Sequence, residues 1–477
     1  MVFPDPNFLF FFLPGLLAAY FLLPRTWRNT VLLLASLAFY TAGGGVFVIL
    51  LLISIVVDYV AGRIVVRGRI SGTESLARSG VALSVLVNLS LLSYFKYANF
   101  FVDQLNAIGS SVGLGTIAWT SVALPIGISF YTFQSMSYTI DVARGRSDPV
   151  RNLKDFGLYV SLFPQLIAGP IVRFHEISNE IHNHPTKLED FSEGIVRFVF
   201  GLVKKVVIAD AAAVVVESVF ELSPDELTTG AAWLGVVAFT IQIYFDFSGY
   251  SDMAIGLGRM FGFHFPENFR RPYSALSITD FWRRWHITLS NWFRDYLYIP
   301  LGGSRGSTRK TYRNLVIVFL LTGLWHGASW TFVVWGVYHG TLLILERVTG
   351  QNPVGDAAPG SALRRGYTLL AVVVGWVFFR ADSLTHAGDI LGAMFIPQLG
   401  PLPPEVALTL TTRVQLTLLL GGLTVFLPRN FVGGIKFPHG SQRWVAAARV
   451  GLMLVAFPYA LALISAGFFS PFLYYQF

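Results

Sequence analysis

Residues 45–61 read Gly-Val-Phe-Val-Ile-Leu-Leu-Leu-Ile-Ser-Ile-Val-Val-Asp-Tyr-Val-Ala, an apolar run with a single charged side chain, Asp58. A helix needs about 20 apolar residues to cross the hydrocarbon core of a bilayer, and about 17 is the short limit. Similar apolar runs recur along the whole chain. The pattern therefore indicates an integral membrane protein.

The composition of the 477-residue chain supports this interpretation. Hydrophobic residues make up 54% and charged residues only 13%, about half the charged share of an average soluble domain. A soluble protein of this size needs a more charged surface, so secreted enzymes, cytosolic enzymes and disordered scaffolds are excluded. Cysteine is absent, which excludes disulfides, thiolate metal sites, cysteine nucleophiles and palmitoylation.

The apolar runs predict an all-α fold, a polytopic membrane bundle of about 10 to 13 membrane-embedded helices. We expect one integral domain over residues 1–477, with core motifs in about 120–381 and additional membrane helices in about 405–470. Residues 124–134 and 163–171 combine Pro, Gly and polar groups at membrane depth, as broken helices that line cavities do. The candidate spans are 7–23, 30–43, 45–61, 79–95, 120–140, 155–172, 194–217, 230–257, 314–326, 330–347, 366–380, 410–427 and 446–469.

Basic residues predict which side of the membrane each loop faces. Asp5 is the only charge before the first apolar run, and Arg25 and Arg28 follow it. This bias predicts an uncleaved first span with an extracytoplasmic N-terminus. The aromatic-rich stretch 261–313 has nine Lys and Arg against three Asp and Glu, so it carries +6 of the net +8. We expect it on the cytoplasmic side, along the membrane surface, and no nucleic-acid partner is implied.

His326 lies in the segment Leu321-Thr-Gly-Leu-Trp-His-Gly-Ala-Ser-Trp330, where it ends or interrupts an apolar helix. An ionisable residue at membrane depth is costly and is by default a functional candidate. Neutral imidazole can be buried, and its ordinary pKa of about 6.5 suits general acid–base catalysis. The alternative is a core histidine that is bonded to a backbone carbonyl.

His286 lies in the segment Phe281-Trp-Arg-Arg-Trp-His-Ile-Thr-Leu-Ser-Asn-Trp-Phe-Arg-Asp295. Its arginines could clamp the phosphates of an anionic donor. The alternative is an interfacial helix with an aromatic belt and snorkelling arginines, which explains Trp and Arg but does not require His. The candidate donor-binding residues in and near the two histidine segments are Arg283, Arg284, Trp285 and Trp325.

A third polar segment, Tyr244-Phe-Asp-Phe-Ser-Gly-Tyr-Ser-Asp-Met253, places two acids inside an apolar span. Such groups must be paired or face a polar cavity. One interpretation is a tunnel lining, in which Asp246 and Ser248 are candidate substrate-binding residues. The other is a buried polar network that orients the helices.

The remaining histidines carry weaker signals. His339 follows His326 by thirteen residues, a spacing that haem-ligating pairs also show, but no second pair exists and a structural role is favoured. No metal site, P-loop, nucleophile elbow or dinucleotide fingerprint is predicted. Six histidines are expected to be solvated loop residues: His175, His182, His184, His264, His386 and His439.

Together these segments resemble the membrane-bound O-acyltransferase family, and within it the bacterial branch of alginate O-acetyltransferases. The resemblance runs through residues 124–141, 163–173, 244–256, 266–303, 324–340 and 376–381, and the tail 472–477. In that family the histidine of a Trp-His-Gly motif is catalytic, and it matches His326. A second polar position in the Trp-Arg-Arg-Trp-His segment matches His286. The family fold is a ring of tilted helices with funnels from both faces that meet near the catalytic histidine.

The resemblance implies a multi-pass enzyme of the bacterial plasma membrane, surrounded by membrane lipids and without a bound cofactor. Acetyl-CoA or another acyl donor would be the co-substrate, received by the stretch 261–313. The acyl group would move toward hydroxyls of an exopolysaccharide or cell-wall glycan, with an extracytoplasmic SGNH-type partner. His326 would be a general base or assist the acyl group, and His286 would orient or polarise. Both direct transfer and an acyl-histidine intermediate stay open, direct transfer being favoured.

Three other functions remain as alternatives. The first is D-alanyl transfer to teichoic acids from a carrier protein, which a related branch of the family performs. The second is a transporter with Asp246 and Asp252 as coupling groups, although transporters usually show paired repeats and none is found. The third is a scaffold in polysaccharide export.

Overall fold

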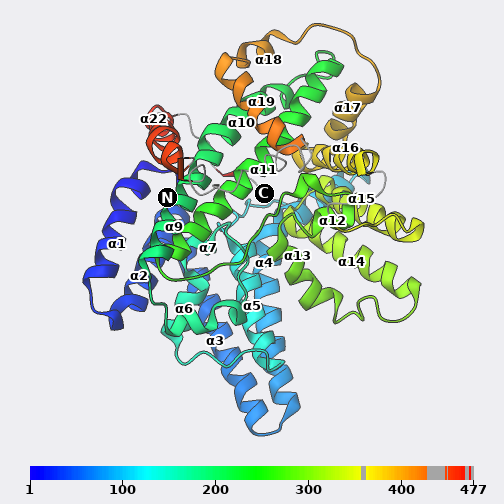
Figure 1. Ribbon diagram of the computed structural model, residues 1–477. Coiled ribbons are helices and arrows are strands. Elements are labelled where there is room, and N and C mark those ends of the chain that lie inside the picture. The colour runs from blue at the N-terminus through cyan, green and yellow to red at the C-terminus, as the bar shows by residue number, and fades with distance from the viewer. Residues whose placement is uncertain (356–360, 427–445, 448, 468–471, 474–477) are drawn as a thin grey trace. The chain divides into compact units, whose positions relative to one another are not determined.

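A computed structural model describes residues 1–355, 361–426, 446–447, 449–467 and 472–473 (Figure 1). Every element in this part of the chain is helical, so the prediction of an all-α fold is confirmed. The candidate span 446–469 and the tail 472–477 are covered only in part. The candidate span 410–427 lacks its last residue, and His439 lies outside the described residues.

Four helical stretches are long and apolar enough to cross a membrane: residues 25–70, 74–111, 229–260 and 361–380. Their composition supports a multi-pass membrane protein. In the first two, only 28% and 22% of the most apolar window is buried inside the protein, as expected for helices whose side chains face lipid. The full number of 10 to 13 membrane helices stays a prediction. Shorter apolar helices cover Phe8–Leu22, Thr412–Phe426 and Arg449–Ser465.

The chain divides into two compact units, residues 1–195 with 254–266, and residues 196–253 with 267–477. The single integral domain stays a prediction. The helices of the first unit are α1 Leu13–Leu22, α2 Arg28–Gly44, α3 Val48–Ile70, α4 Glu74–Ser111, α5 Ile128–Ala143, α6 Leu153–Ser161, α7 Phe163–Leu166 and α8 Phe174–His182. Helix α9 covers Leu188–Val203 and helix α11 covers Thr229–Met260.

Helices α3 and α4 of the first unit pack closely because small residues face each other. A Cβ atom on Gly68 would lie 2.4 Å from the backbone nitrogen of Ala77, so only glycine permits this approach. Between the same helices the buried carboxylate of Asp58 accepts hydrogen bonds from Ser84 and, at 2.7 Å, from Asn88. These bonds satisfy a charge-bearing group within an apolar helix.

The two predicted broken helices of the first unit are indeed interrupted. Gly127 has a φ of +74°, a left-handed conformation that favours glycine. Helix α5 therefore begins at Ile128, and the prediction that a span starts at residue 120 was wrong. A Cβ atom on Gly127 would lie 2.8 Å from the carbonyl oxygen of Leu166, so the two broken segments lie against each other.

His184 corrects one prediction for the loop histidines, because this side chain is buried. Its Nδ1 lies 2.7 Å from the Tyr20 hydroxyl, and its Nε2 lies 2.7 Å from Oδ1 of Asn29. Burial lowers the pKa of the imidazole. His184 thus ties the loop that precedes α9 to α1 and α2, a contact between distant segments that a local pattern of polar residues does not reveal.

The second unit contains both histidine motifs. His286 lies between two short helices, and His326 ends a longer helix that forms a helical hairpin with the next one. A Cβ atom on Gly323 would lie 2.3 Å from the carbonyl oxygen of Phe332, so glycine lets helices α14 (Thr308–His326) and α15 (Trp330–Thr349) pack backbone to backbone. The helices of the second unit are α10 Asp210–Phe220, α12 Ile278–Trp282, α13 Ile287–Phe293, α14 Thr308–His326, α15 Trp330–Thr349, α16 Ser361–Arg380, α17 Leu384–Phe395, α18 Pro404–Thr409, α19 Thr412–Phe426 and α22 Phe457–Ser465.

The basic, aromatic composition of the stretch 261–313 predicts a position along a surface. The structure shows that only part of the stretch is exposed. Trp282, Trp285 and Trp292 are all buried, and His286 is fully buried. The reason is that the large aromatic side chains gain most by removal from solvent, and they draw α12 and α13 into the interior of the unit. The prediction holds for most of the basic side chains of the stretch, such as Arg283 and Arg294, which remain exposed.

Candidate active site

The two histidines singled out in the sequence meet in the second unit. The ring centroids of His286 and His326 lie 6.4 Å apart, with an angle of 58° between the ring planes. Only 3% of His326 and none of His286 is exposed. Forty residues separate them in the chain, so the fold brings together two groups with acid–base chemistry in a site that excludes bulk water.

His326 is the last residue of α14, and the motif around it fixes where that helix ends. Gly327 has an extended backbone, with a φ of −162°, and a Cβ atom there would lie 2.1 Å from the ring of Phe332. The glycine of the Trp-His-Gly motif is therefore a steric requirement. Trp335 and Phe379 stand edge-on to the His326 ring, at 5.1 and 5.2 Å, and surround it with apolar walls.

His286 occupies a backbone conformation that side chains rarely adopt. Its φ is +44°, and with Arg271 it is one of two non-glycine residues with a positive φ in the described part of the chain. Such conformations cost energy and cluster at functional sites. The turn lets His286 precede α13 while its ring points into the interior, 4.7 Å from the ring of Phe247 on α11.

Asn268 determines which nitrogen of His286 carries the proton. Asn268 Oδ1 lies 3.2 Å from His286 Nδ1 and accepts hydrogen bonds from the backbone nitrogen and hydroxyl of Thr288 at 3.3 and 2.9 Å. Its Nδ2 donates to Ser251 at 3.1 Å. Because Oδ1 only accepts, His286 must donate from Nδ1, which leaves Nε2 as the basic nitrogen. Burial lowers the pKa of His286 to about 3, so the ring is neutral at physiological pH.

Trp325, a predicted binding residue, contacts both histidines. Its ring centroid is 6.0 Å from that of His286 and 5.0 Å from that of His326. Trp335, which the sequence analysis did not select, contacts His326 on one side and His339 at 5.2 Å on another. The favoured structural role of His339 stays a prediction, but the residue belongs to the aromatic surroundings of the site.

Arg283 lines a cavity of about 480 Å³ next to this aromatic cluster. The guanidinium is exposed and makes no ion pair within the part of the chain that the structure covers. Trp282, another wall of the cavity, lies 5.5 Å from Trp335, whose ring in turn contacts His326. Two indole rings in contact therefore lie between the cavity and His326. Apolar walls come from Ile287, Leu289, Phe293, Leu315, Val318, Phe319 and Leu343.

Two other predicted donor-binding residues serve local structure. Arg284 forms an ion pair with Asp280 at 2.9 Å and donates a hydrogen bond to Ser274 at 3.0 Å. Trp285 is stacked on Phe281, with centroids 5.6 Å apart, and is almost fully buried. Neither residue is among those that line the 480 Å³ cavity, and both hold the turn that precedes His286.

Asp246 lies in a buried ionic network, which supports the second of its two interpretations. Its carboxylate lies 2.7 Å from the Lys205 amine and accepts a hydrogen bond from the backbone nitrogen of Leu473 at 2.9 Å. Lys205 also pairs with Asp210 at 2.6 Å. The buried Ser248 hydroxyl has no hydrogen-bond partner within the described residues. The contacts of Asp246 thus join α11 to Lys205, which precedes α10, and to Leu473.

Sequence reasoning missed Asn268 and Glu346, which set the geometry of the site. The buried Glu346 of α15 accepts hydrogen bonds from the backbone nitrogens of Ile278 and Thr279, at 2.5 and 3.0 Å, and so caps α12. No local motif marks Glu346 as a cap, because it lies 68 residues from the helix it serves. Asn268 lies in a stretch without regular secondary structure, where an amide is commonplace.

Comparison with known proteins gives consistent matches. The model of the MBOAT, membrane-bound O-acyltransferase family, matches residues 90–352, which include His286 and His326. The probable alginate O-acetylase of Azotobacter vinelandii is 46% identical over 100% of both chains. The peptidoglycan O-acetyltransferase of Helicobacter pylori is 37% identical over 83% of this chain and 80% of its own. The teichoic acid D-alanyltransferase of Bacillus subtilis is 28% identical, over only 46% of this chain and 58% of its own.

Proposed function

This chain belongs to the membrane-bound O-acyltransferase family, and from that premise we propose that His326 and His286 form its catalytic pair. The protein is a multi-pass membrane acyltransferase, and it transfers an acyl group to a polysaccharide. The observation that carries the proposal is the 6.4 Å separation of two buried imidazole rings in a common aromatic enclosure. The acyl group is most simply acetyl.

His326 acts as the general base toward the acceptor hydroxyl. The hydroxyl proton moves to the imidazole, the oxygen forms a bond to the acyl carbon, and the carbon–sulfur bond of a thioester donor breaks. The departing thiolate then takes the proton from His326, which regenerates the base. No thiol of the protein is available as a relay, since the chain has no cysteine; direct transfer is therefore simpler than an acyl-enzyme.

His286 orients the reacting groups and does not itself donate a proton. Asn268 holds its proton on Nδ1, so the neutral ring offers only an acceptor at Nε2. An acceptor at this place aligns an O–H or N–H group next to His326. Of the two roles expected for His286, orientation agrees better with this hydrogen bond than polarisation of the acyl carbonyl does.

The 480 Å³ cavity is the site proposed for the acyl donor, with acetyl-CoA as the simplest candidate. Arg283 is an exposed cation on its wall, and guanidinium groups suit phosphates. Apolar side chains such as Leu289 and Val318 suit an uncharged linker between phosphates and thioester. Trp282 on the cavity wall contacts Trp335, and Trp335 contacts His326.

The acceptor is a glycan, with an exopolysaccharide or a cell-wall glycan as the two candidate classes. Relatives named for alginate and for peptidoglycan O-acetylation match 100% and 83% of this chain. D-alanyl transfer to teichoic acid is less well supported, because that relative matches less than half of it. We place the protein in the bacterial inner membrane, with an extracytoplasmic N-terminus and an SGNH-type partner that completes the transfer.

Complementation of a gene deletion tests this function. The gene is deleted, wild-type protein or a His326→Ala variant is returned, and ester-linked acetyl groups on purified surface glycans are measured by NMR. We expect the deletion to lose acetyl groups from one glycan, and His326→Ala to fail to restore them at normal membrane abundance. His386→Ala, which changes a histidine outside the site, is the matched control. Restored acetylation by His326→Ala would contradict the catalytic assignment.

A further inference from the structure

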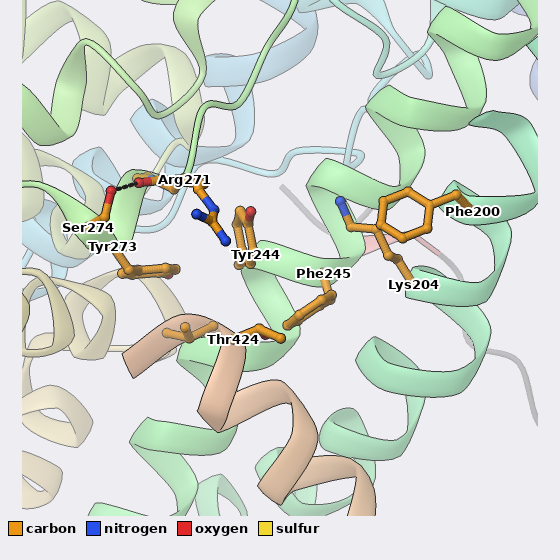
Figure 2. A pocket seen from close by; sticks show the side chains of 10 residues that line it. Phe200, Lys204, Tyr244, Phe245, Arg271, Tyr273, Ser274 and Thr424 are labelled. Carbon is orange, nitrogen blue, oxygen red and sulfur yellow. Dashed lines mark hydrogen bonds between the residues drawn. The ribbon is translucent and has the colours of Figure 1, made fainter. Parts of the chain in front are cut away.

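A second cavity of the same unit, of about 240 Å³, is lined by aromatic rings and two cations. Figure 2 shows the Arg271 guanidinium and the Lys204 amine on either side of Tyr244. The Lys204 amine lies 5.5 Å from the centroid of that ring. Arg271 and Lys204 come from segments 67 residues apart in the sequence. The fold therefore brings two positive charges to the same cavity.

The backbone at Arg271 is held in a conformation that presents its side chain there. Its φ is +49°, in the left-handed region that favours glycine. Pro272 follows it, and the Ser274 hydroxyl donates to the Arg271 carbonyl at 2.8 Å, which closes the turn. The guanidinium is exposed and makes no ion pair within the residues that the structure describes. Strained residues of this kind cluster at sites that bind ligands.

The charges around this cavity favour an anion. Lys204 pairs with Asp252 at 2.9 Å, and the same carboxylate binds Arg197, which also pairs with Glu267 at 2.6 Å. A further cation, the buried Arg365, donates hydrogen bonds to the backbone carbonyls of Tyr273 and Val425, at 3.2 and 3.4 Å. Both of those residues line the cavity. Three cations therefore lie in or behind the wall, and a phosphate would satisfy the exposed one.

The surroundings of the cavity are those of a protein surface covered by lipid. Phe200, on its wall, is 49% exposed. Helix α19 contributes Thr424 and Val425 to the wall and leaves a row of leucines exposed. In a multi-pass membrane protein such apolar side chains face acyl chains. The exposed leucines of α19 are Leu416, Leu419, Leu420 and Leu423.

We propose that this cavity binds the phosphate headgroup of an anionic phospholipid. Arg271 and Lys204 contact the phosphate, and the acyl chains run along Phe200 and α19. The site is separate from the donor cavity at Arg283, since the two share no lining residue. Tyr244 and Tyr273 line it and also contact Trp285, at 6.3 and 6.1 Å, so a bound lipid would support the aromatic layer that precedes His286.

Native mass spectrometry of the full chain in detergent tests the proposal. The protein is titrated with phosphatidylglycerol or phosphatidylcholine of identical acyl chains. We expect tighter binding of phosphatidylglycerol, and a loss of about fivefold in that preference when Arg271 is removed. Arg271→Gly is the informative variant because glycine keeps the left-handed backbone while it deletes the charge. Arg271→Lys should retain most of the preference.

Arg270→Gly is the matched control, because this exposed neighbour does not line the cavity. Equal binding of the two lipids by wild-type protein would overturn the proposal, and so would an equal loss in the Arg270 and Arg271 variants. Coenzyme A is the competing arm, since it carries the same phosphate chemistry. Displacement of phosphatidylglycerol by coenzyme A, lost in Arg271→Gly, would assign the cavity to the acyl donor and contradict the lipid assignment.

Discussion

The proton of the His286 imidazole is placed by a single amide side chain. Asn268 Oδ1 faces three donors, His286 Nδ1 and the backbone nitrogen and hydroxyl of Thr288. A flipped amide would set its NH2 group against the backbone N–H of Thr288, which can only donate, so the amide has one satisfactory orientation. In the proposed reaction His286 is therefore a neutral acceptor, and this state depends on Asn268.

Asn268→Asp should change the pH dependence of the reaction. A carboxylate still accepts from Nδ1, but its negative charge stabilises the imidazolium and raises the pKa of His286 from about 3. The neutral ring is then lost as pH falls through the raised value, so the acid limb of kcat against pH moves to higher pH. Asn268→Ala should lower kcat about 10- to 100-fold with a smaller change in KM. Unchanged pH profiles in both variants would remove Asn268 from this role.

Gly327→Ala should disturb the end of α14 and displace His326. The new methyl group would meet the Phe332 ring at 2.1 Å, and overpacking of this kind costs about 1–3 kcal/mol. We expect a lower thermal unfolding temperature and reduced acyl transfer. Gly366→Ala is the control, because nothing lies within 4 Å of its Cβ position; it should leave stability unchanged or slightly raised. Similar behaviour of the two variants would contradict the steric argument.

At the scale of elements, α12 and α13 are short helices that owe their position to tertiary contacts. Helix α12 covers only Ile278–Trp282, too short to be stable alone. Glu346 of α15 caps its N-terminus, while Phe281 within it stacks on Trp285. The strained turn at His286 is therefore fixed by contacts with α15 and by the aromatic layer, rather than by local helix propensity.

Glu346→Ala should loosen α12 and with it the His286 turn. Two buried backbone nitrogens lose their acceptor, and an unsatisfied helix cap costs about 1–2 kcal/mol. Thermal unfolding in detergent should show the destabilisation, and kcat should fall more than the affinity for the donor. Glu405→Ala is the control, since this exposed acid lies in the first turn of α18. An equal effect of both substitutions would rule out a special role for Glu346.

At the scale of the whole chain, the sequence predicts some features well because they are local. Apolar runs and low charge predict an all-α membrane protein, and two histidines in unusual contexts are the two that meet in the structure. The family resemblance agrees with the matches to known relatives. Features that depend on distant partners are not predicted. The burial of His184 against Tyr20 and the pairing of Asp246 with Lys205 involve residues whose neighbours in sequence reveal nothing of their neighbours in space.

The most direct test of the central claim is a double-mutant cycle on the histidine pair. Acyl transfer by purified protein is measured with acetyl-CoA for wild type, His286→Ala, His326→Ala and the double variant. If the two act as one catalytic unit, His326→Ala lowers kcat/KM by about a thousandfold or more, His286→Ala lowers it less, and the double variant is no slower than His326→Ala. Losses that multiply, or substantial activity in His326→Ala, would contradict the account.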